Sequence, residues 1–286
     1  MRTPPPIYPA FKPCAPTNQD LVDRKRPKNG ILVGGRAAQM LGWDGFENET
    51  EVVWLVPHTT GTSRSGVETF DRYGRVIRSR AWTEEHDFLG GVPVAPPHLV
   101  LATIGEGLTS AHRWPGDYTP IPPRDRIELA LEHYLRRGHP VPKLNTATLS
   151  IVRQLMRNRG QNEPPTESYA ETRGIQQLRG QGLVKVFRQV PLCLQGKIVN
   201  RIDLVYPFRP SARRPDIFDP EEGAPVEIDG REYHERQFEK DRRRGNNHTV
   251  AGARLLVATP TLIERNTTEL VRDINFIKDR RKQSGR

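Results

Sequence analysis

The chain has 286 residues but little cysteine and no long apolar run. Its two cysteines, Cys14 and Cys193, lie far apart and in no metal-ligand spacing, which excludes a disulfide framework and predicts a reducing compartment. No apolar stretch reaches the roughly 20 residues that a membrane-spanning helix needs, so no membrane partner is expected. Residues 1–29 are rich in proline and lack the apolar segment of a secretory signal, so they are predicted to be a flexible arm of a cytoplasmic protein.

Lysine is also scarce, since only 9 of the 44 basic residues are lysine, and the net charge is +10. The planar guanidinium group of arginine binds two oxygens at once and therefore suits phosphate. A positive balance of this size favours a polyanionic partner such as nucleic acid. The alternative is a bias of composition, because an arginine-rich chain is also typical of a GC-rich bacterial or phage genome.

The first half of the chain predicts an α+β domain over residues 30–118, followed by a helical connector over 119–160. Hydrophobic patterns predict a short helix in 30–45, a buried strand at 50–57, paired strands in 67–82, an extended and then helical segment in 90–108, and helices at 123–139 and 145–160. The helix at 123–139 is predicted to be amphipathic. The segment "QNEPP" (161–165) interrupts the pattern, and the main domain boundary is predicted there.

Residues 161–286 predict a second, α/β domain whose elements follow the order α-β-β-β-α-β-α. Its first helix, at 166–183, is expected to begin with Thr166 as the N-cap. Gln195-Gly196 is expected to form a tight turn between two strands. The other predicted elements are strands at 184–194, 197–207, 225–230 and 253–260, a helix from 232, and a last helix after 260.

Three carboxylates fall on neighbouring strands of this second domain. Asp203 lies in the strand at 197–207, and Glu227 and Asp229 lie in the next strand, where alternation directs both to one face. Consecutive strands usually pair, so the three are expected at one edge of a small sheet. Repulsion makes such a cluster costly, and a divalent cation that prefers oxygen ligands, Mg²⁺ or Mn²⁺, removes that cost. Glu167, near the start of the preceding helix, could supply a further carboxylate.

These positions also have other interpretations. Glu227 and Asp229 could instead face solvent on an edge strand. Gln189 could be a strand residue directed at the same site.

The order of elements and the run "RIDLVYP…VEIDGREYH…DRRR…GARLL" resemble the PD-(D/E)XK nuclease superfamily, and in particular the branch related to very-short-patch-repair endonucleases. The resemblance covers roughly residues 163–278 and depends on an ordered set of short motifs. The matching positions are Glu167, Arg201 with Asp203, Glu227, Asp229, Gly230, His234, Asp241 with Arg244, and Gly252 with Arg254. Three features depart from the pattern. Asp229 stands where the superfamily has lysine, and Gly245 where the branch often has aspartate. The loop between the second and third strands is unusually long and contains Pro215-Asp216, so Asp216 is a rival to Asp203 as the metal-binding aspartate, and Asp203 is preferred because apolar strand residues surround it.

This resemblance implies a restriction-endonuclease-like α-β-β-β-α-β core with a mixed sheet. It also implies a Mg²⁺-dependent DNA endonuclease or nickase that hydrolyses phosphodiester bonds in phage defence, repair or restriction. The implied catalytic residues are Asp203, Glu227, Asp229, His234 and Glu167, of which the first three would bind the metal, and the implied DNA contacts are Arg201, Arg243, Arg244 and Arg254. The alternative is a catalytically silent DNA-binding regulator, or an antitoxin-like component, built on the same fold.

Residues 30–138 resemble the region that precedes such nuclease-like domains in many actinobacterial proteins, which is often described as similar to antitoxins of the abortive-infection type. The stretches "RAAQMLGW", "GGVPVAPPHLVLATI" and "ALEHYLRRG" carry this resemblance. The small winged-helix segment expected in front of them is missing or much shortened. The resemblance implies that the N-terminal domain recognises DNA or a protein partner.

Overall fold

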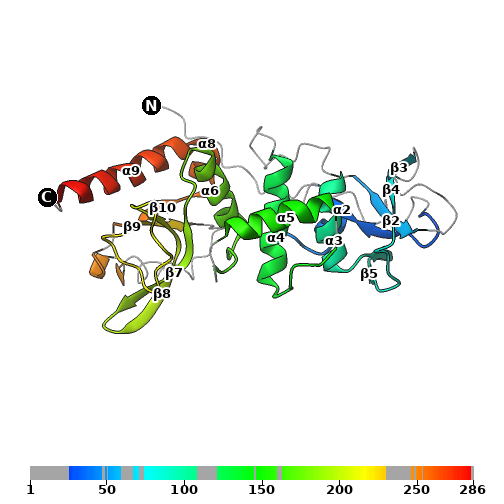
Figure 1. Ribbon diagram of the computed structural model, residues 1–286, viewed down its shortest axis with the longest axis horizontal. Coiled ribbons are helices and arrows are strands. Elements are labelled where there is room, and N and C mark those ends of the chain that lie inside the picture. Colours follow the sequence, from blue (N-terminus) through cyan, green and yellow to red (C-terminus); the bar gives the residue numbers. More distant parts are fainter. Residues whose placement is uncertain are drawn as a thin grey trace, which may run out of the picture. The chain divides into compact units, whose positions relative to one another are not determined.

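The structure, a computed structural model, describes residues 26–46, 49, 51–58, 67–70, 74–107, 121–144, 146–159, 163–229, 246–247, 249–252 and 254–284. The chain divides into two compact units, Met1–Leu155 and Met156–Arg286. Each unit contains a mixed sheet with helices, which confirms the α/β class (Figure 1). Within the described ranges, no helix combines the length and the apolar character needed to cross a membrane.

The sheet of the first unit has the strand order β3-β4-β2-β1-β6-β5. Its strands are β1 (Ile31–Val33), β2 (Val53–Pro57), β3 (Val67–Phe70), β4 (Gly74–Ser79), β5 (Asp87–Leu89) and β6 (Val92–Val94). The strand predicted at 50–57 is confirmed as β2, and the paired strands predicted in 67–82 are confirmed as the antiparallel pair β3 and β4. The prediction for 30–45 missed β1, whose three residues are fully buried.

The helices of this unit are α2 (Gly34–Met40), α3 (Pro97–Thr103), the short 3₁₀ helix η1 (Ile104–Gly107), α4 (Pro123–Arg136) and α5 (Ala147–Asn158), whose last residues belong to the second unit. Helices α2 and α3 contact β1. The helix predicted at 123–139 is confirmed as α4, but its polar side is buried as well, because every residue from Arg126 to Tyr134 is buried, including Glu128 and Glu132. Its charged residues therefore do not form a solvated face, and tertiary packing overrides the pattern seen in the sequence.

A buried polar cluster lies at the centre of the first unit. The guanidinium group of Arg126 pairs with the carboxylate of Glu49, and both side chains are almost fully buried. Arg126 also lies over the ring of Phe46, with its Cζ atom 5.3 Å from the ring centroid. Arg36 donates to the backbone oxygen of Glu49 at 3.1 Å. An added Cβ at Gly35 would lie 2.7 Å from Glu49 Oε2, so only glycine fits beside this ion pair.

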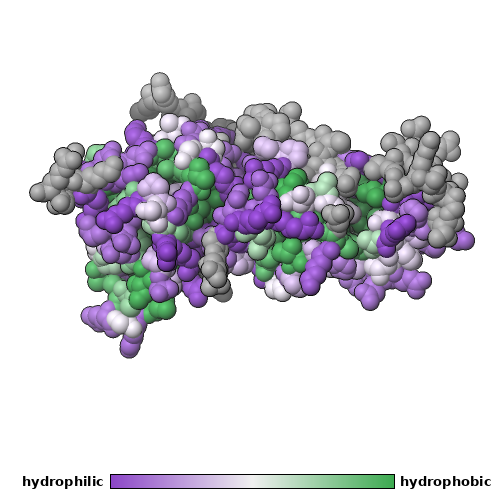
Figure 2. Space-filling view, viewed as in Figure 1, coloured by the Kyte–Doolittle hydropathy of each residue, from purple (hydrophilic) through white to green (hydrophobic). Residues whose placement is uncertain are grey.

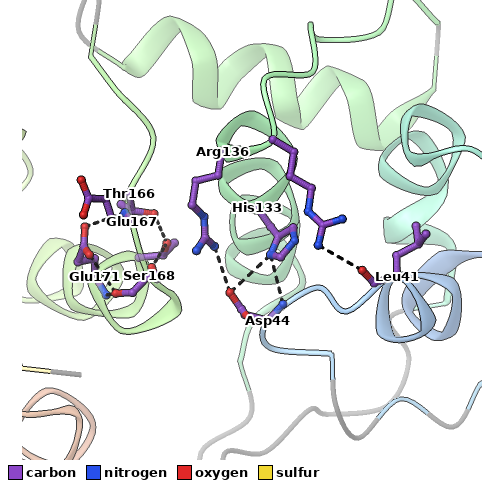
Figure 3. Close-up of polar contacts among 10 residues, drawn as sticks. Leu41, Asp44, His133, Arg136, Thr166, Glu167, Ser168 and Glu171 are labelled. Atoms are coloured by element: carbon purple, nitrogen blue, oxygen red, sulfur yellow. Dashed lines mark hydrogen bonds and ion pairs between the residues drawn. The ribbon is translucent and has the colours of Figure 1, made fainter. Parts of the chain in front are cut away.

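A second polar contact joins the loop after α2 to α4 (Figure 3). Asp44 Oδ2 lies 3.5 Å from His133 Nδ1 and 3.3 Å from Arg136 Nη2. The ring of Trp43 stacks on that of His133, with the centroids 5.7 Å apart. The hydrogen bond from His133, helped by the charge of Arg136, holds the pKa of the Asp44 carboxyl below its usual value, although burial opposes this effect.

The second unit follows the predicted order of elements as far as it is described. Its sheet has the order β10-β9-β8-β7, with β9 and β10 parallel and the other pairs antiparallel. Its elements are α6 (Tyr169–Gly180), β7 (Phe187–Leu194), β8 (Lys197–Pro207), β9 (Gly223–Ile228), β10 (Leu256–Ala258), α8 (Pro260–Arg265) and α9 (Thr267–Ser284). The N-cap of α6 is Ser168 and not the predicted Thr166, because the Ser168 hydroxyl accepts from the Glu171 N–H at 3.1 Å. The helix predicted from residue 232 begins outside the described residues.

Two separate apolar clusters pack on this sheet. Helices α6, α8 and α9 cover one face, as Figure 1 shows, and contribute residues such as Ile175, Ile263 and Ile274 to a core with Leu204 and Val226. A smaller cluster is made by Phe187, Val190, Leu192, Ile202, Val205 and Phe218. Phe218 comes from the long loop between β8 and β9, so this part of the loop packs on the sheet.

Candidate functional site

Three polar residues lie in one row across the sheet of the second unit. In β7 and β8 the pairs Arg188↔Leu204 and Val190↔Ile202 flank the positions of Gln189 and Asp203, which this register sets opposite each other. In β8 and β9 the last pair is Leu204↔Val226, and one further step in the same register sets Asp203 opposite Glu227. Side chains opposite one another on antiparallel strands lie on the same face. Gln189, Asp203 and Glu227 therefore form what we call the site row.

Strands β8 and β9 separate at the site row. Pairing between β8 and β9 stops at Val226, while β9 remains paired with β10 as far as Ile228. The carboxylate of Asp203 takes part in this opening, since its Oδ2 accepts from the backbone N–H of Ile228 at 2.9 Å. Asp203 and Glu227 are only 6% and 7% exposed, so two carboxyl groups lie buried at a point where the backbone ladder ends. Burial of this kind is costly without compensating partners.

Gln189 reaches the row through an unusual backbone conformation. Its φ angle is 48°, in the left-handed region that residues other than glycine rarely adopt. Arg214, from the loop between β8 and β9, donates to the backbone oxygens of Arg188 and Gln189 at 3.2 and 3.1 Å. Such strained residues persist where the surrounding structure holds them, and they concentrate at functional sites.

Glu171 completes the cluster from the first turn of α6. The amide of Gln189 donates to Glu171 Oε2 at 3.0 Å and lies 3.5 Å from Asp203 Oδ1. The Glu167 backbone N–H donates to the same Glu171 Oε2 at 2.9 Å, and the Ser168 hydroxyl donates to Oε1 at 3.0 Å (Figure 3). We call Glu171 together with the site row the carboxylate site.

The electrostatics of the carboxylate site favour a proton or another cation. Burial, followed by the negative charge of Asp203, raises the pKa of Glu171 from 4.5 to about 7. The hydrogen bonds from Glu167, Ser168 and Gln189 oppose this effect without cancelling it. Near neutral pH, Glu171 is therefore divided between its protonated and ionised forms. This is the physical consequence of placing two acidic groups together out of water.

The structure distributes the predicted site residues unevenly. Glu167 is exposed, and it is Glu171, one helical turn later, that lies beside Gln189. Asp229 follows the end of β9 instead of lying in the strand, and its N–H donates to Ala258 O at 2.8 Å. The remaining predicted residues fall into three groups: Asp216, Arg201 and Arg254 are exposed, Asp203 and Glu227 are buried in the site row, and His234, Arg243 and Arg244 lie outside the described residues.

Glu171 was absent from the predicted set, although the sequence contains a signal for it. Ser168 and Glu171 have the spacing of a capping box, in which a serine N-cap is followed three residues later by glutamate. That motif begins the helix at Ser168 and puts Glu171 in its first turn. Glu167 then falls before the N-cap and is exposed.

The donor set of this site suits a hard cation. Asp203, Glu227 and Glu171 supply only oxygen, and Mg²⁺ is usually bound through one or two carboxylates with water in its other positions. No group of three or more His, Cys, Asp and Glu residues in metal-binding arrangement is found among the described residues. A cation would therefore be held by two of these carboxylates and would replace the Gln189 amide as the partner of at least one of them.

Comparison with known proteins adds no relative. No family model matches the chain, and no significant match was found among curated proteins or solved structures.

Proposed function

We propose that the second unit is a Mg²⁺-dependent DNA endonuclease or nickase with a restriction-endonuclease-like core. The observation that carries this proposal is the carboxylate site, in which Asp203 and Glu227 occupy one row where two strands part and Glu171 joins them from a helix. Buried acidic groups in such an arrangement are costly for a purely structural role. The net charge of +10 and the abundance of arginine favour a polyanionic substrate.

Different residues of the carboxylate site would have different roles in phosphodiester hydrolysis. Asp203 and Glu227 would hold the cation, which when bound polarises a phosphoryl oxygen and acidifies water. Asp203 is kept in position by the Ile228 N–H at 2.9 Å, so its Oδ1 remains directed at Gln189 and the site. Glu171, close to Gln189, can accept or release a proton near neutral pH. His234, Arg201, Arg243, Arg244 and Arg254 remain the proposed groups for proton transfer and for binding the phosphate backbone.

The proposal is tested by incubating supercoiled plasmid with the protein and Mg²⁺ or Mn²⁺. Wild type should convert the plasmid to nicked or linear forms, and Asp203→Asn and Glu227→Gln should each lower the rate at least a hundredfold. Asp216→Asn is the matched control, because Asp216 is an exposed aspartate of the same unit. The variants Glu167→Gln and Glu171→Gln test which of these two glutamates takes part in cleavage. Only Glu171→Gln should lower the rate.

Binding of the cation gives a readout that does not depend on turnover. A cation that binds only the folded protein raises its melting temperature by mass action. Mg²⁺ should raise the melting temperature of the second unit in wild type and in Asp216→Asn, and not in Asp203→Asn. Equal cleavage by wild type and Asp203→Asn, or an equal Mg²⁺ effect on both, would contradict the assignment.

A second candidate function is a silent DNA-binding regulator on the same fold. It is favoured by the Gln189 amide, which lies within 3.5 Å of both Glu171 and Asp203 and so partners these carboxylates without any cation. This alternative predicts DNA binding that weakens steeply with salt, no nicking in either metal, and no Mg²⁺ effect on melting. The plasmid and melting experiments therefore separate the two functions.

A further inference from the structure

The β7 and β8 hairpin extends past the rest of its sheet. Residues Lys197–Ile202 pair with Val190–Leu194 of β7, whereas the pairs of β8 with β9 begin only at Leu204. Six strand residues span about 20 Å. A two-stranded ribbon of that length therefore projects from the sheet, and Figure 1 shows it pointing away from α6, α8 and α9. We call it the β7–β8 ribbon.

Apolar side chains are exposed toward the end of this ribbon. Ile198 is 65% exposed and Val199 is 39% exposed, and Figure 2 shows apolar residues gathered over the same hairpin. Single exposed apolar residues are common on protein surfaces, so these two are informative only because of their charged surroundings. From Phe187 to Ile202 the hairpin contains three basic residues and no acidic residue, and of these Lys197 and Arg201 are exposed.

The ribbon is poorly suited to adding a strand from another protein. β7 is an edge strand of the sheet, which is the usual place for such pairing. However, it contains Pro191, which has no N–H to donate, and its register shifts between Leu192 and Cys193. Proline and bulges on an edge strand are the features that prevent further pairing. Addition of a foreign strand to β7 is therefore disfavoured.

We propose that the turn end of the β7–β8 ribbon enters the major groove of duplex DNA, so that Ile198 on one face of the ribbon and Val199 on the other contact the two sides of the groove and Lys197 contacts the phosphate backbone. This rests on the proposed function, because the base of the ribbon carries Gln189 and Asp203 of the carboxylate site. The major groove of B-DNA is about 12 Å wide and 8.5 Å deep and admits a two-stranded ribbon, whereas the minor groove is about half as wide. The charge of the ribbon complements the phosphates that border the groove.

The position of the ribbon implies where it contacts the DNA. Ile198 precedes Asp203 by five residues along β8, which corresponds to about 17 Å of extended strand. Base pairs repeat every 3.4 Å, so the ribbon would contact the duplex within about five base pairs of the bond that is cut. It would also favour DNA over duplex RNA, because the major groove of A-form RNA is too narrow and deep for side chains to read.

The test measures DNA binding through the fluorescence anisotropy of a fluorescein-labelled 30-base-pair DNA duplex without divalent cation. It compares wild type with the double variant Ile198→Ser/Val199→Ser, which we call the serine variant, and with Lys197→Gln. The serine variant should bind about tenfold more weakly at all salt concentrations, since it loses apolar contact alone. Lys197→Gln should lower the slope of log K against log salt by about one. Val184→Ser and Lys278→Gln are matched controls outside the ribbon, Val184 being 72% exposed, and should bind like wild type.

Two further measurements separate this proposal from the function on which it rests. Hydrolysis of bis(p-nitrophenyl) phosphate, which is too small to reach the ribbon, should be equal in wild type and the serine variant. If wild type cleaves DNA and the ribbon variants bind it normally, the ribbon proposal fails and the nuclease stands. If wild type cleaves neither substrate but the variants lose DNA binding, the nuclease fails and the ribbon stands. Two other results would overturn the proposal. One is equal binding of duplex RNA and duplex DNA by wild type, and the other is an oligomer that dissociates in the serine variant, as measured by sedimentation.

Discussion

Replacing Glu171 with glutamine should change how the stability of the second unit depends on pH. Burial and the charge of Asp203 raise the pKa of Glu171 from 4.5 to about 7 in the folded protein. The folded state therefore retains the proton over a pH range in which the unfolded state has lost it. Glutamine has the same shape and does not ionise, so the variant lacks this dependence.

The size and sign of the effect follow from the two pKa values. Because the folded pKa is raised, the contribution of Glu171 to stability is fully present below pH 4.5 and is lost as the pH rises toward about 7. One pKa unit corresponds to about 1.4 kcal/mol, so the whole interval corresponds to about 3 kcal/mol. Between pH 5 and pH 8, wild type should lose about 2.5 kcal/mol relative to Glu171→Gln. Hydrogen bonds that glutamine cannot make are absent at both pH values and cancel in this difference.

The assay is urea denaturation at pH 5 and pH 8 without divalent cation. Unfolding of the second unit is monitored by the hydrogen exchange of peptides from residues 163–229. Tryptophan fluorescence cannot replace it, because all four tryptophans lie in the first unit. The exposed Glu167→Gln is the matched control for loss of a negative charge beside α6. If the stability difference between Glu171→Gln and wild type is the same at both pH values, Glu171 does not share a buried site with Asp203 and the reasoning is refuted.

Three further predictions concern single side chains. Gly35→Ala should destabilise the first unit by about 1–3 kcal/mol in urea monitored by tryptophan fluorescence, because its Cβ would meet Glu49 Oε2 at 2.7 Å; an unchanged midpoint would mean that Glu49 moves aside. Asp44→Asn should remove a small stabilisation that wild type loses as the pH falls below about 4, since the pKa of Asp44 is lowered in the folded state, and acid unfolding read by fluorescence checks this. Gln189→Gly should be about 1–3 kcal/mol more stable than Gln189→Val, because φ is 48°; equal melting temperatures would contradict the strain.

Much of the secondary structure follows from local patterns. Strand β8 was predictable over its whole length, because apolar residues dominate its second half and the Gln195-Gly196 turn precedes it. The pairing of β8 with β9 was also predictable, since strands joined in sequence usually lie side by side. The helix α4 was also predictable, but the burial of its charged residues Arg126, Glu128 and Glu132 was not, because it depends on tertiary contacts.

The sequence by itself determined the α/β class, the order of strands in the second unit and the two carboxylates of its central strands. Only the tertiary structure decided that Glu171 joins them, because the local Ser168 cap sets its place in α6 and the contact with Gln189 of β7 brings it to the site. It also decided that Gln189 faces Asp203, because Arg214 holds a backbone conformation that no local pattern predicts. Local periodicity records which residues prefer strand or helix, whereas a site depends on contacts between segments far apart in the chain.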